Sequence, residues 1–317
     1  MMVSVLIPCF NAERFIRQSI GSILDQSYQD FEVIVLDDAS TDSSLKVIRS
    51  FSDPRIRVLV NPSNLGYLKT MNRLFGEAKG NLIAFQDADD VSNEKRLETQ
   101  VAFLEQYPSV SIVGTNYDLI DENDLCLGTY SVSEGRDQLK ELIPYRNIFQ
   151  KPSIMFRNEV YAKVGGYREA FLDLKNISED YDWLLRASHH FEFGNINHSP
   201  ALYQYRSVTT AMTKDFDHPE QLFGEKIAQF LYKERLQRGS DSMSEGNYKP
   251  IFDFIEELKK PYLLDPSRFY RERAEALMYH GLKKKAISSA LKAFGARKSF
   301  KNLRLVQYCI RKTIFTL

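Results

Sequence analysis

Apolar and polar positions alternate with two different periods over the first hundred residues. Short apolar runs predict buried strands at residues 3–7, 31–36, 56–60 and 82–85. In the segments between these runs, apolar residues recur at helical spacing, which predicts three helices. The alternation of strands and helices predicts a mainly parallel sheet covered by helices on both faces. In such a sheet, ligands bind beyond the carboxyl ends of the strands.

The pattern changes after residue 100. Further strands are predicted at residues 111–114, 153–156 and 201–205, and the turn chemistry near the middle of residues 116–133 indicates a hairpin. A helix is predicted at residues 181–187.

From about residue 219 onward, the periodicity predicts helices only. We therefore expect two domains, an α/β domain over residues 1–218 and a helical region over residues 219–317. Residues 239–249, which are rich in Ser, Gly and charged side chains, predict a flexible joint inside the helical region.

Charge is balanced over the whole chain but segregated along it. The sequence has 42 Lys+Arg and 42 Asp+Glu, and this balance argues against a protein that binds nucleic acid along its whole length. Residues 267–317, the basic segment, hold 13 of the basic residues and 2 of the acidic ones. Apolar residues interleave with these cations. The segment therefore predicts either helices lying on an anionic membrane surface or a solvated face of packed helices.

The sequence shows no pattern that indicates export or insertion into a membrane. The three cysteines, Cys9, Cys126 and Cys309, are far apart and predict neither a disulfide framework nor a zinc site. The first residues lack a basic stretch and reach Pro8 after a short apolar run, which is not typical of a signal peptide. No apolar run approaches the roughly 20 residues that span a bilayer. We expect a cytoplasmic protein, peripheral on the inner face of the cell membrane if the basic segment binds lipid.

Two acidic clusters follow predicted strands. Asp87, Asp89 and Asp90 come directly after the fourth strand, and carboxylates this close together repel one another unless a positive charge lies among them. Mg²⁺ or Mn²⁺ meets that need, because these cations take oxygen ligands and commonly bridge to substrate phosphates. A solvated acidic turn is the alternative. Asp38, after the second strand, predicts either a helix N-cap or turn, or a contact to a nucleotide.

Several motifs occur in a fixed order along residues 3–210. They are VSVLIPCFN at 3–11, SILDQS at 22–27, DDASTD at 37–42, NLG at 64–66, Asn72 and FQDADD at 85–90. This series resembles the family 2 inverting glycosyltransferases of the GT-A fold. The resemblance implies a Rossmann-like sheet, a nucleotide-diphosphate sugar as donor (a UDP-sugar above others), a divalent cation and a glycan acceptor. A lipid-linked acceptor and bacterial surface polysaccharide synthesis fit the same family.

The resemblance also implies roles for individual residues. Contacts to the donor nucleotide are implied for Pro8, Phe10, Asn11, Asp38, Lys69, Asp87 and Ala88. Asp89 is the implied metal ligand. The family places its catalytic base in a Glu-Asp pair, which is matched here by Glu179 and Asp180. Inversion by a single displacement needs one base to take the proton of the acceptor hydroxyl, and Asp180 is the candidate by position.

Four further residues are weaker candidates for contacts to the acceptor or the diphosphate. They are Asp90, Trp183, Arg157 and Arg206. Many relatives carry a histidine shortly after the position of Arg206, and this chain does not. Without this histidine, the sequence does not identify a third metal ligand. Arg206 is then the candidate cation for the leaving diphosphate.

Two other functions are alternatives to transfer of a sugar. A nucleotidyltransferase of the same fold class should have a glycine-rich loop after the first strand to hold a triphosphate, and residues 8–12 contain no glycine. An inactive protein that binds nucleotide sugars and recruits partners would be expected to lose Asp89 or Asp180, and both are present.

Overall fold

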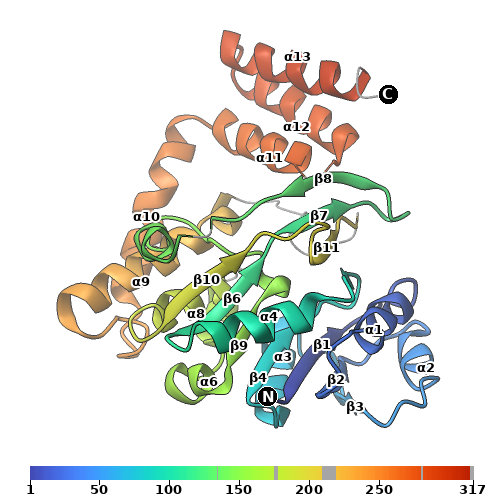
Figure 1. The fold of residues 1–317 in the computed structure, drawn as a ribbon. Coiled ribbons are helices and arrows are strands. Elements are labelled where there is room, and N and C mark those ends of the chain that lie inside the picture. Colours follow the sequence, from blue (N-terminus) through green and yellow to red (C-terminus); the bar gives the residue numbers. More distant parts are fainter. Residues whose placement is uncertain (134, 175–177, 209–218, 280, 315–317) are drawn as a thin grey trace. The chain divides into compact units, whose positions relative to one another are not determined.

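The computed structural model describes the chain except for residues 134, 175–177, 209–218, 280 and 315–317 (Figure 1). It divides into two compact units, which are described separately below. The first unit contains Met1–Glu169 and Glu179–Arg206, and the second contains Ala170–Ser178 and Ser207–Leu317. The predicted boundary between residues 218 and 219 falls at the edge of a segment outside the described residues, so it stays a prediction.

A seven-stranded sheet forms the centre of the first unit. Its strand order is β10-β6-β9-β4-β1-β2-β3. The bounds are β1 (Val3–Cys9), β2 (Phe31–Asp37), β3 (Ile56–Val60), β4 (Leu82–Phe85), β6 (Val110–Thr115), β9 (Met155–Arg157) and β10 (Glu192–Ile196). Only β9 runs antiparallel to its neighbours within this sheet. The prediction of a mainly parallel sheet flanked by helices is confirmed.

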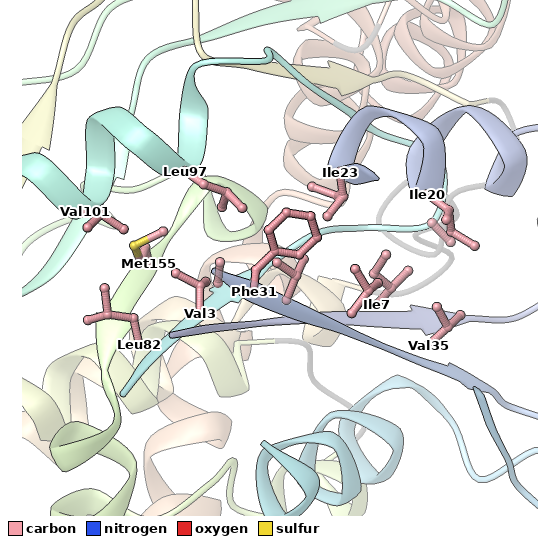
Figure 2. Packing of buried hydrophobic residues seen from close by; sticks show 14 of the residues in the cluster. Val3, Ile7, Ile20, Ile23, Phe31, Val35, Leu82, Leu97, Val101 and Met155 are labelled. Atoms are coloured by element: carbon pink, nitrogen blue, oxygen red, sulfur yellow. The ribbon is translucent and has the colours of Figure 1, made fainter. Parts of the chain in front are cut away.

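Two of the helices that cover one face of this sheet are α1 (Ile16–Leu24) and α4 (Arg96–Gln106). Figure 2 shows Ile20 and Ile23 of α1 and Leu97 of α4 directed at strand residues such as Val3 and Ile7. These side chains are fully buried because alternate residues of each strand point to the same face. The remaining α-helices of the first unit are α2 (Ser44–Ile48), α3 (Tyr67–Glu77), α5 (Arg136–Leu142), α6 (Asn158–Val164) and α8 (Glu179–Ala187).

An aromatic cluster packs on the opposite face of the sheet. The ring of Phe75, on α3, lies 5.7 Å from that of Phe85, and Trp183, on α8, lies 5.0 Å from Phe156. Phe85 and Phe156 belong to β4 and β9, where they alternate with residues of the first face. The cluster fixes α3 and α8 against the sheet.

A second, four-stranded sheet has the order β5-β11-β7-β8. Its strands are β5 (Val91–Ser92), β7 (Tyr117–Ile120), β8 (Cys126–Tyr130) and β11 (Tyr203–Arg206). The antiparallel pair β7–β8 is the predicted hairpin. Because β5 follows β4 directly, this sheet is tied to the carboxyl end of β4.

The second unit is helical. Its long helices are α9 (Gly224–Arg238), α10 (Lys249–Leu264), α11 (Ser267–Tyr279), α12 (Lys283–Ala296) and α13 (Phe300–Ile314), and its short ones are α7 (Ala170–Asp173) and the 3₁₀ turn η3 (Pro219–Leu222). Buried alanines, among them Ala274, Ala286 and Ala290, let α11, α12 and α13 pack closely. Among the described residues, no helix is both long and apolar enough to cross a membrane.

The predicted flexible joint at residues 239–249 is wrong. Asp241 and Ser242 are fully buried. The Asp241 carboxylate forms an ion pair of 2.6 Å with Arg235, and the backbone N–H of Ser242 donates to Glu234. These bonds fix the connection between α9 and α10, which composition alone did not indicate.

Candidate functional site

The carboxyl ends of β1 and β2 are joined by a polar contact. Asn11 has a left-handed backbone with φ of 49° and follows β1. Its side-chain oxygen accepts a hydrogen bond of 2.8 Å from the backbone N–H of Thr41, beyond β2. Beside it, Phe10 is 46% exposed and Pro8 is half-buried. These predicted nucleotide-binding residues therefore lie together at one edge of the sheet.

Asp38 organises the next loop. Its carboxylate is 3% exposed and accepts hydrogen bonds from the Asn61 amide (2.6 Å) and from the backbone N–H groups of Leu65 (2.9 Å) and Gly66 (2.8 Å). These bonds reach a distant loop and do not close a turn at Asp38 itself, and the contact to a nucleotide stays a prediction. Lys69, on α3, is exposed, with its Nζ 3.9 Å from the carboxylate of Glu169.

Residues 86–90, the acidic loop, follow β4 and are held by a buried arginine. The Arg96 guanidinium donates to the carbonyl of Phe85 (2.7 Å) and to that of Pro152 (3.0 Å). It also donates to the side chains of Gln86 (3.1 Å) and Ser92 (2.9 Å). Burial lowers the pKa of Arg96 to about 10, so it remains charged at neutral pH. Arg96 therefore clamps the acidic loop to the segment that precedes β9.

The acids of this loop have different environments. Asp90 is fully buried, and its carboxylate accepts bonds from the Tyr203 hydroxyl (2.8 Å) and the backbone N–H of Arg206 (2.7 Å). Asp87 and Asp89 are partly exposed, whereas Ala88 packs in the core. Burial, together with the charge of Asp87, raises the pKa of Asp89 to about 6. Asp89 is thus a carboxylate with too little positive charge around it.

Lys151 enters the site because β9 is antiparallel to β4. The beginning of an antiparallel strand lies beside the end of its neighbour, so the short helix η1 (Lys151–Ser153) meets the acidic loop. The Lys151 Nζ lies 3.9 Å from the Asp87 carboxylate and 3.9 Å from the centre of the Tyr67 ring. Burial works to lower the pKa of Lys151, but attraction by Asp87, Asp180 and Glu179 raises it overall. Lys151 is therefore a fixed cation coupled to both groups of acids.

The Glu-Asp pair begins α8. Asp180 is partly exposed, and its carboxylate accepts a hydrogen bond of 2.7 Å from the backbone N–H of Tyr181, whereas Glu179 is 9% exposed. The pKa of Tyr67 is raised well above its usual value by burial and then by the charges of Asp87, Glu179 and Asp180. The fold therefore brings the acidic loop, Lys151 and the start of α8 to one place.

Asp182, one turn into this helix, has a structural environment. It is fully buried and pairs with the guanidinium groups of Arg168 and Arg186. Asn72, from the motif series, holds the segment before Arg168, because its amide bonds both the N–H and the carbonyl of Tyr167. These contacts fix the beginning of α8 relative to α3.

Four weaker candidates are corrected by their contacts. Asp90 is bonded inside the protein, as described above. Trp183 is 1% exposed, and its indole N–H donates to Gly165. Arg157 donates to the carbonyls of Val110 and Leu104. None of these three side chains is placed to contact an acceptor.

Arg206 is the fourth, and it is a buried clamp. Its guanidinium donates to the carbonyls of Asp89 (2.6 Å) and Asp121 (2.9 Å) and to the side chain of Gln18 (3.0 Å), and it pairs with Asp124 at 2.7 Å. Its side chain is 1% exposed. It therefore fixes the acidic loop against α1 and the β7–β8 turn, in place of the predicted contact to a diphosphate.

The predicted metal site can be tested against these contacts. Within the part of the chain that the structure describes, no group of three or more His, Cys, Asp and Glu is arranged to hold a metal ion. Mg²⁺ and its relatives are often held by one or two carboxylates together with substrate phosphates. Asp87 and Asp89 supply such oxygens, and the raised pKa of Asp89 marks a shortage of positive charge. The donor set thus fits a cation completed by a diphosphate.

Comparison with known proteins identifies the family. The model of glycosyl transferase family 2 matches residues 4–165. The chain belongs to this family. EpsE of Bacillus subtilis, which is named as a glycosyltransferase, is 34% identical over 223 residues, covering 67% of this chain and 75% of EpsE. A β-1,3-glucosyltransferase of Escherichia coli, WfgD, is 36% identical over 124 residues, covering 39% of this chain and 49% of WfgD. This protein is therefore a glycosyltransferase, as the sequence predicted.

Solved structures share the fold of this glycosyltransferase. Residues 1–349 of TarS from Staphylococcus aureus, in complex with UDP-GlcNAc, superpose with a TM-score of 0.62 and 17% identity, covering 100% of this chain and 93% of that one. A mannosyltransferase of Pyrobaculum calidifontis, in complex with GDP-Man and Mn²⁺, gives a TM-score of 0.54 and 15% identity, with 99% and 81% covered. The predicted GT-A fold is confirmed.

Two residues that shape the site were missed or undervalued in the sequence. Nothing in the sequence pattern singled out Arg96. Lys151 directly precedes the segment 152–156 that contains a predicted strand, and the sequence pattern assigns it no role. The available signal was the lysine directly before Pro152-Ser153, but placing it beside Asp87 requires knowing that β9 is antiparallel.

Proposed function

We propose that this glycosyltransferase moves a sugar from a UDP-sugar to a hydroxyl of a glycan, with inversion at the anomeric carbon. The observation that carries the proposal is the meeting of the acidic loop, Lys151 and the Glu179–Asp180 pair at the carboxyl end of β4. UDP as the nucleotide is supported by the donor in WfgD's name and by the UDP-GlcNAc bound to TarS. A lipid-linked acceptor in bacterial polysaccharide synthesis is supported by the diphosphoundecaprenol acceptor in WfgD's name.

We assign each residue of the site a role in this reaction. Pro8, Phe10 and Asn11 line the edge that would receive the nucleotide, and Asp38 shapes the loop beside it. Asp87 and Asp89 would hold Mg²⁺ or Mn²⁺, which when bound neutralises charge on the leaving diphosphate. Lys151 adds a fixed cation at the same place, and the exposed Lys69 is a further candidate. Asp180 takes the proton of the attacking hydroxyl, and Glu179 positions it.

A thermal-shift screen tests the donor. We expect UDP-sugars with Mn²⁺ to raise the Tm, because a molecule that binds only the native state stabilises it by about 2.7 kcal/mol at a hundredfold excess over Kd. GDP- and dTDP-sugars at equal concentration serve as controls for the choice of nucleobase. A shift that is larger with GDP-sugars would overturn the choice of UDP. The absence of any shift with all three would overturn the proposed activity.

We also propose that α13 attaches the enzyme to an anionic membrane surface. Phe300, Leu303, Ile310 and Ile314 are exposed and recur on one side of the helix, with Phe300 69% exposed. Exposed cations, among them Lys301, Arg304 and Arg311, adjoin this stripe. The opposite side, with Val306 and Cys309, packs on α11 and α12. Apolar residues beside cations suit the boundary between acyl chains and anionic headgroups.

Sedimentation with vesicles of phosphatidylglycerol and phosphatidylcholine tests this attachment. The protein should co-sediment at low salt and be released at high salt, because each cation near the surface contributes about 1 kcal/mol that salt screens. The double variant Arg304→Glu/Arg311→Glu should stay in solution. The matched variant Lys249→Glu/Lys260→Glu reverses two exposed lysines of α10 and should sediment like the wild type. Equal sedimentation of both variants would contradict the attachment through α13.

A further inference from the structure

A cavity of about 290 Å³ lies in the first unit, outside the residues assigned so far. Residues 130–133 and 146–150 line it together with Tyr117. The first segment ends the β7–β8 hairpin, and the second leads into η1 and β9. Its volume lies near the lower end of the range for small-molecule sites, about 300–1,000 Å³, and suits one ring-sized group.

Two of the residues that line the cavity connect it to the proposed catalytic residues. Gln150, in its lining, directly precedes Lys151, whose ammonium lies 3.9 Å from Asp87. Tyr117, also in its lining, packs edge-to-face on Tyr205 with ring centres 6.2 Å apart. The pKa of Tyr205 is raised by burial and then by the carboxylates of the acidic loop, which agrees with its lying close to them. A group in the cavity would therefore be a near neighbour of the reacting centre.

Sheet topology separates this cavity from the nucleotide edge. The proposed nucleotide residues follow β1 and β2, which lie on one side of β4 in the strand order. The cavity residues connect to β6 and β9, which lie on the other side. With the acidic loop after β4 between them, a molecule in the cavity would approach the donor sugar from the side opposite the nucleotide.

The lining combines aromatic rings with unused hydrogen-bonding groups. Tyr117 and Tyr130 stack with ring centres 5.1 Å apart and planes 8° from parallel. Among the described residues, the Arg146 guanidinium and the Gln150 amide have no hydrogen-bonding partner, and Asn147 uses only its oxygen. Among the described residues that line the cavity, none is acidic. Aromatic rings cover the C–H faces of a sugar, while amide and guanidinium groups bond its hydroxyls.

The walls of the cavity are held in place by β10 and the residue after it. The Asn195 amide donates to the carbonyls of Ser133 (3.1 Å) and Ile148 (3.2 Å), which belong to opposite segments. Asn197 exchanges two hydrogen bonds of 2.8 Å with the backbone of Val132. The two segments therefore keep their separation without a bound molecule, which lowers the entropic cost of binding.

We infer that this cavity binds a pyranose ring of the acceptor glycan. This assignment rests on the proposed function, because it names where the acceptor of that reaction is held. Tyr117 and Tyr130 provide the aromatic wall, and Arg146, Asn147 and Gln150 bond the ring hydroxyls. The ring held here places the attacking hydroxyl toward Lys151 and Asp180.

Saturation-transfer NMR with methyl pyranosides of glucose, N-acetylglucosamine, galactose and mannose, each added to the full chain with saturating UDP, tests the assignment. At least one pyranoside should receive saturation from the wild-type protein. Arg146→Ala and Tyr130→Ala should weaken its affinity by about tenfold or more, the loss expected for one hydrogen bond to a charged group or one aromatic contact. Tyr130→Phe, which keeps the ring, should retain binding, and so should Lys140→Ala, which removes an exposed cation of α5 outside the cavity.

The outcomes separate the two proposals. A UDP-dependent rise in Tm without transfer to any pyranoside would overturn the cavity assignment and leave the donor proposal standing. Pyranoside binding that persists in both Arg146→Ala and Tyr130→Ala would also overturn it, because the sugar would then bind elsewhere. Absence of the UDP shift itself would overturn the proposed function. Arg146 is exposed, so its replacement should not disturb folding, and this can be checked by its Tm.

Discussion

Replacing Asp180 with asparagine should reduce turnover by about 10²–10⁴ while leaving the affinity for UDP within a few-fold of the wild type. Asparagine has the shape of aspartate but cannot take a proton from the acceptor hydroxyl at neutral pH. Single-turnover kinetics with a radiolabelled UDP-sugar and a separate titration of UDP measure the two quantities independently. A collapse of UDP affinity in Asp180→Asn would place this residue in the donor site and the base elsewhere.

Asp182→Asn is the matched control, because Asp182 lies two residues after Asp180 in the same helix. The Asp182 carboxylate is buried between Arg168 and Arg186, so neutralising it removes the negative charge that both guanidinium groups face. Breaking such a buried pair costs about 3–5 kcal/mol. The variant should therefore lose several degrees of Tm, whereas Asp180→Asn should melt like the wild type. If Asp182→Asn had a normal Tm but lost turnover, Asp182 would be the base and Asp180 would not.

Asp89→Asn should abolish detectable transfer without unfolding the protein. The replacement removes the charged oxygens of a partly buried carboxylate whose pKa is already raised to about 6, so the fold should tolerate the neutral amide. In the wild type, Mn²⁺ should increase the Tm shift produced by UDP, and this increase should be absent in the variant. Excess chelator should have the same effect on the wild type. Full transfer in chelator would remove the cation from the reaction.

Lys151→Met distinguishes the fixed cation from the metal. Methionine keeps most of the buried volume but removes the charge that lies 3.9 Å from Asp87. We expect a loss of about 10² in turnover, typical of removing one electrostatic contact to developing charge. The residual activity should still depend on Mn²⁺, and Lys151→Arg should recover part of the loss. Activity of Lys151→Met that no longer responds to Mn²⁺ would mean that the lysine and the metal act as one unit.

Local pattern in the sequence determined most of the architecture. The strand at residues 82–85 begins and ends where its apolar run does, because a strand buried on both faces must be apolar throughout. The acids after β4 could also be assigned to the ligand-binding edge of the sheet from the sequence. They directly follow the carboxyl end of a parallel strand, and ligands bind beyond such ends. The ordered motif series then identified the family, which the comparisons confirmed.

Tertiary structure decided which of these polar residues are available for chemistry. Arg206, Arg157 and Trp183 carry side chains that suit substrate contacts, but each satisfies carbonyl groups or fills an aromatic cluster in the interior. Whether a polar group faces solvent or a buried carbonyl depends on residues far away in the chain. For Arg206 these include Asp89 and Asp121, and a single sequence does not reveal such pairings.

The same dependence on distant residues explains Lys151 and the cavity beside it. Lys151 reaches Asp87 only because β9 is inserted antiparallel between β4 and β6, and strand direction within a sheet leaves no mark on the apolar pattern of a three-residue strand. The cavity needs Tyr117, Tyr130 and Arg146 to meet from a hairpin and a separate loop. The sequence alone determined the residue types and located the first four strands, and only long-range packing decided which side chains meet.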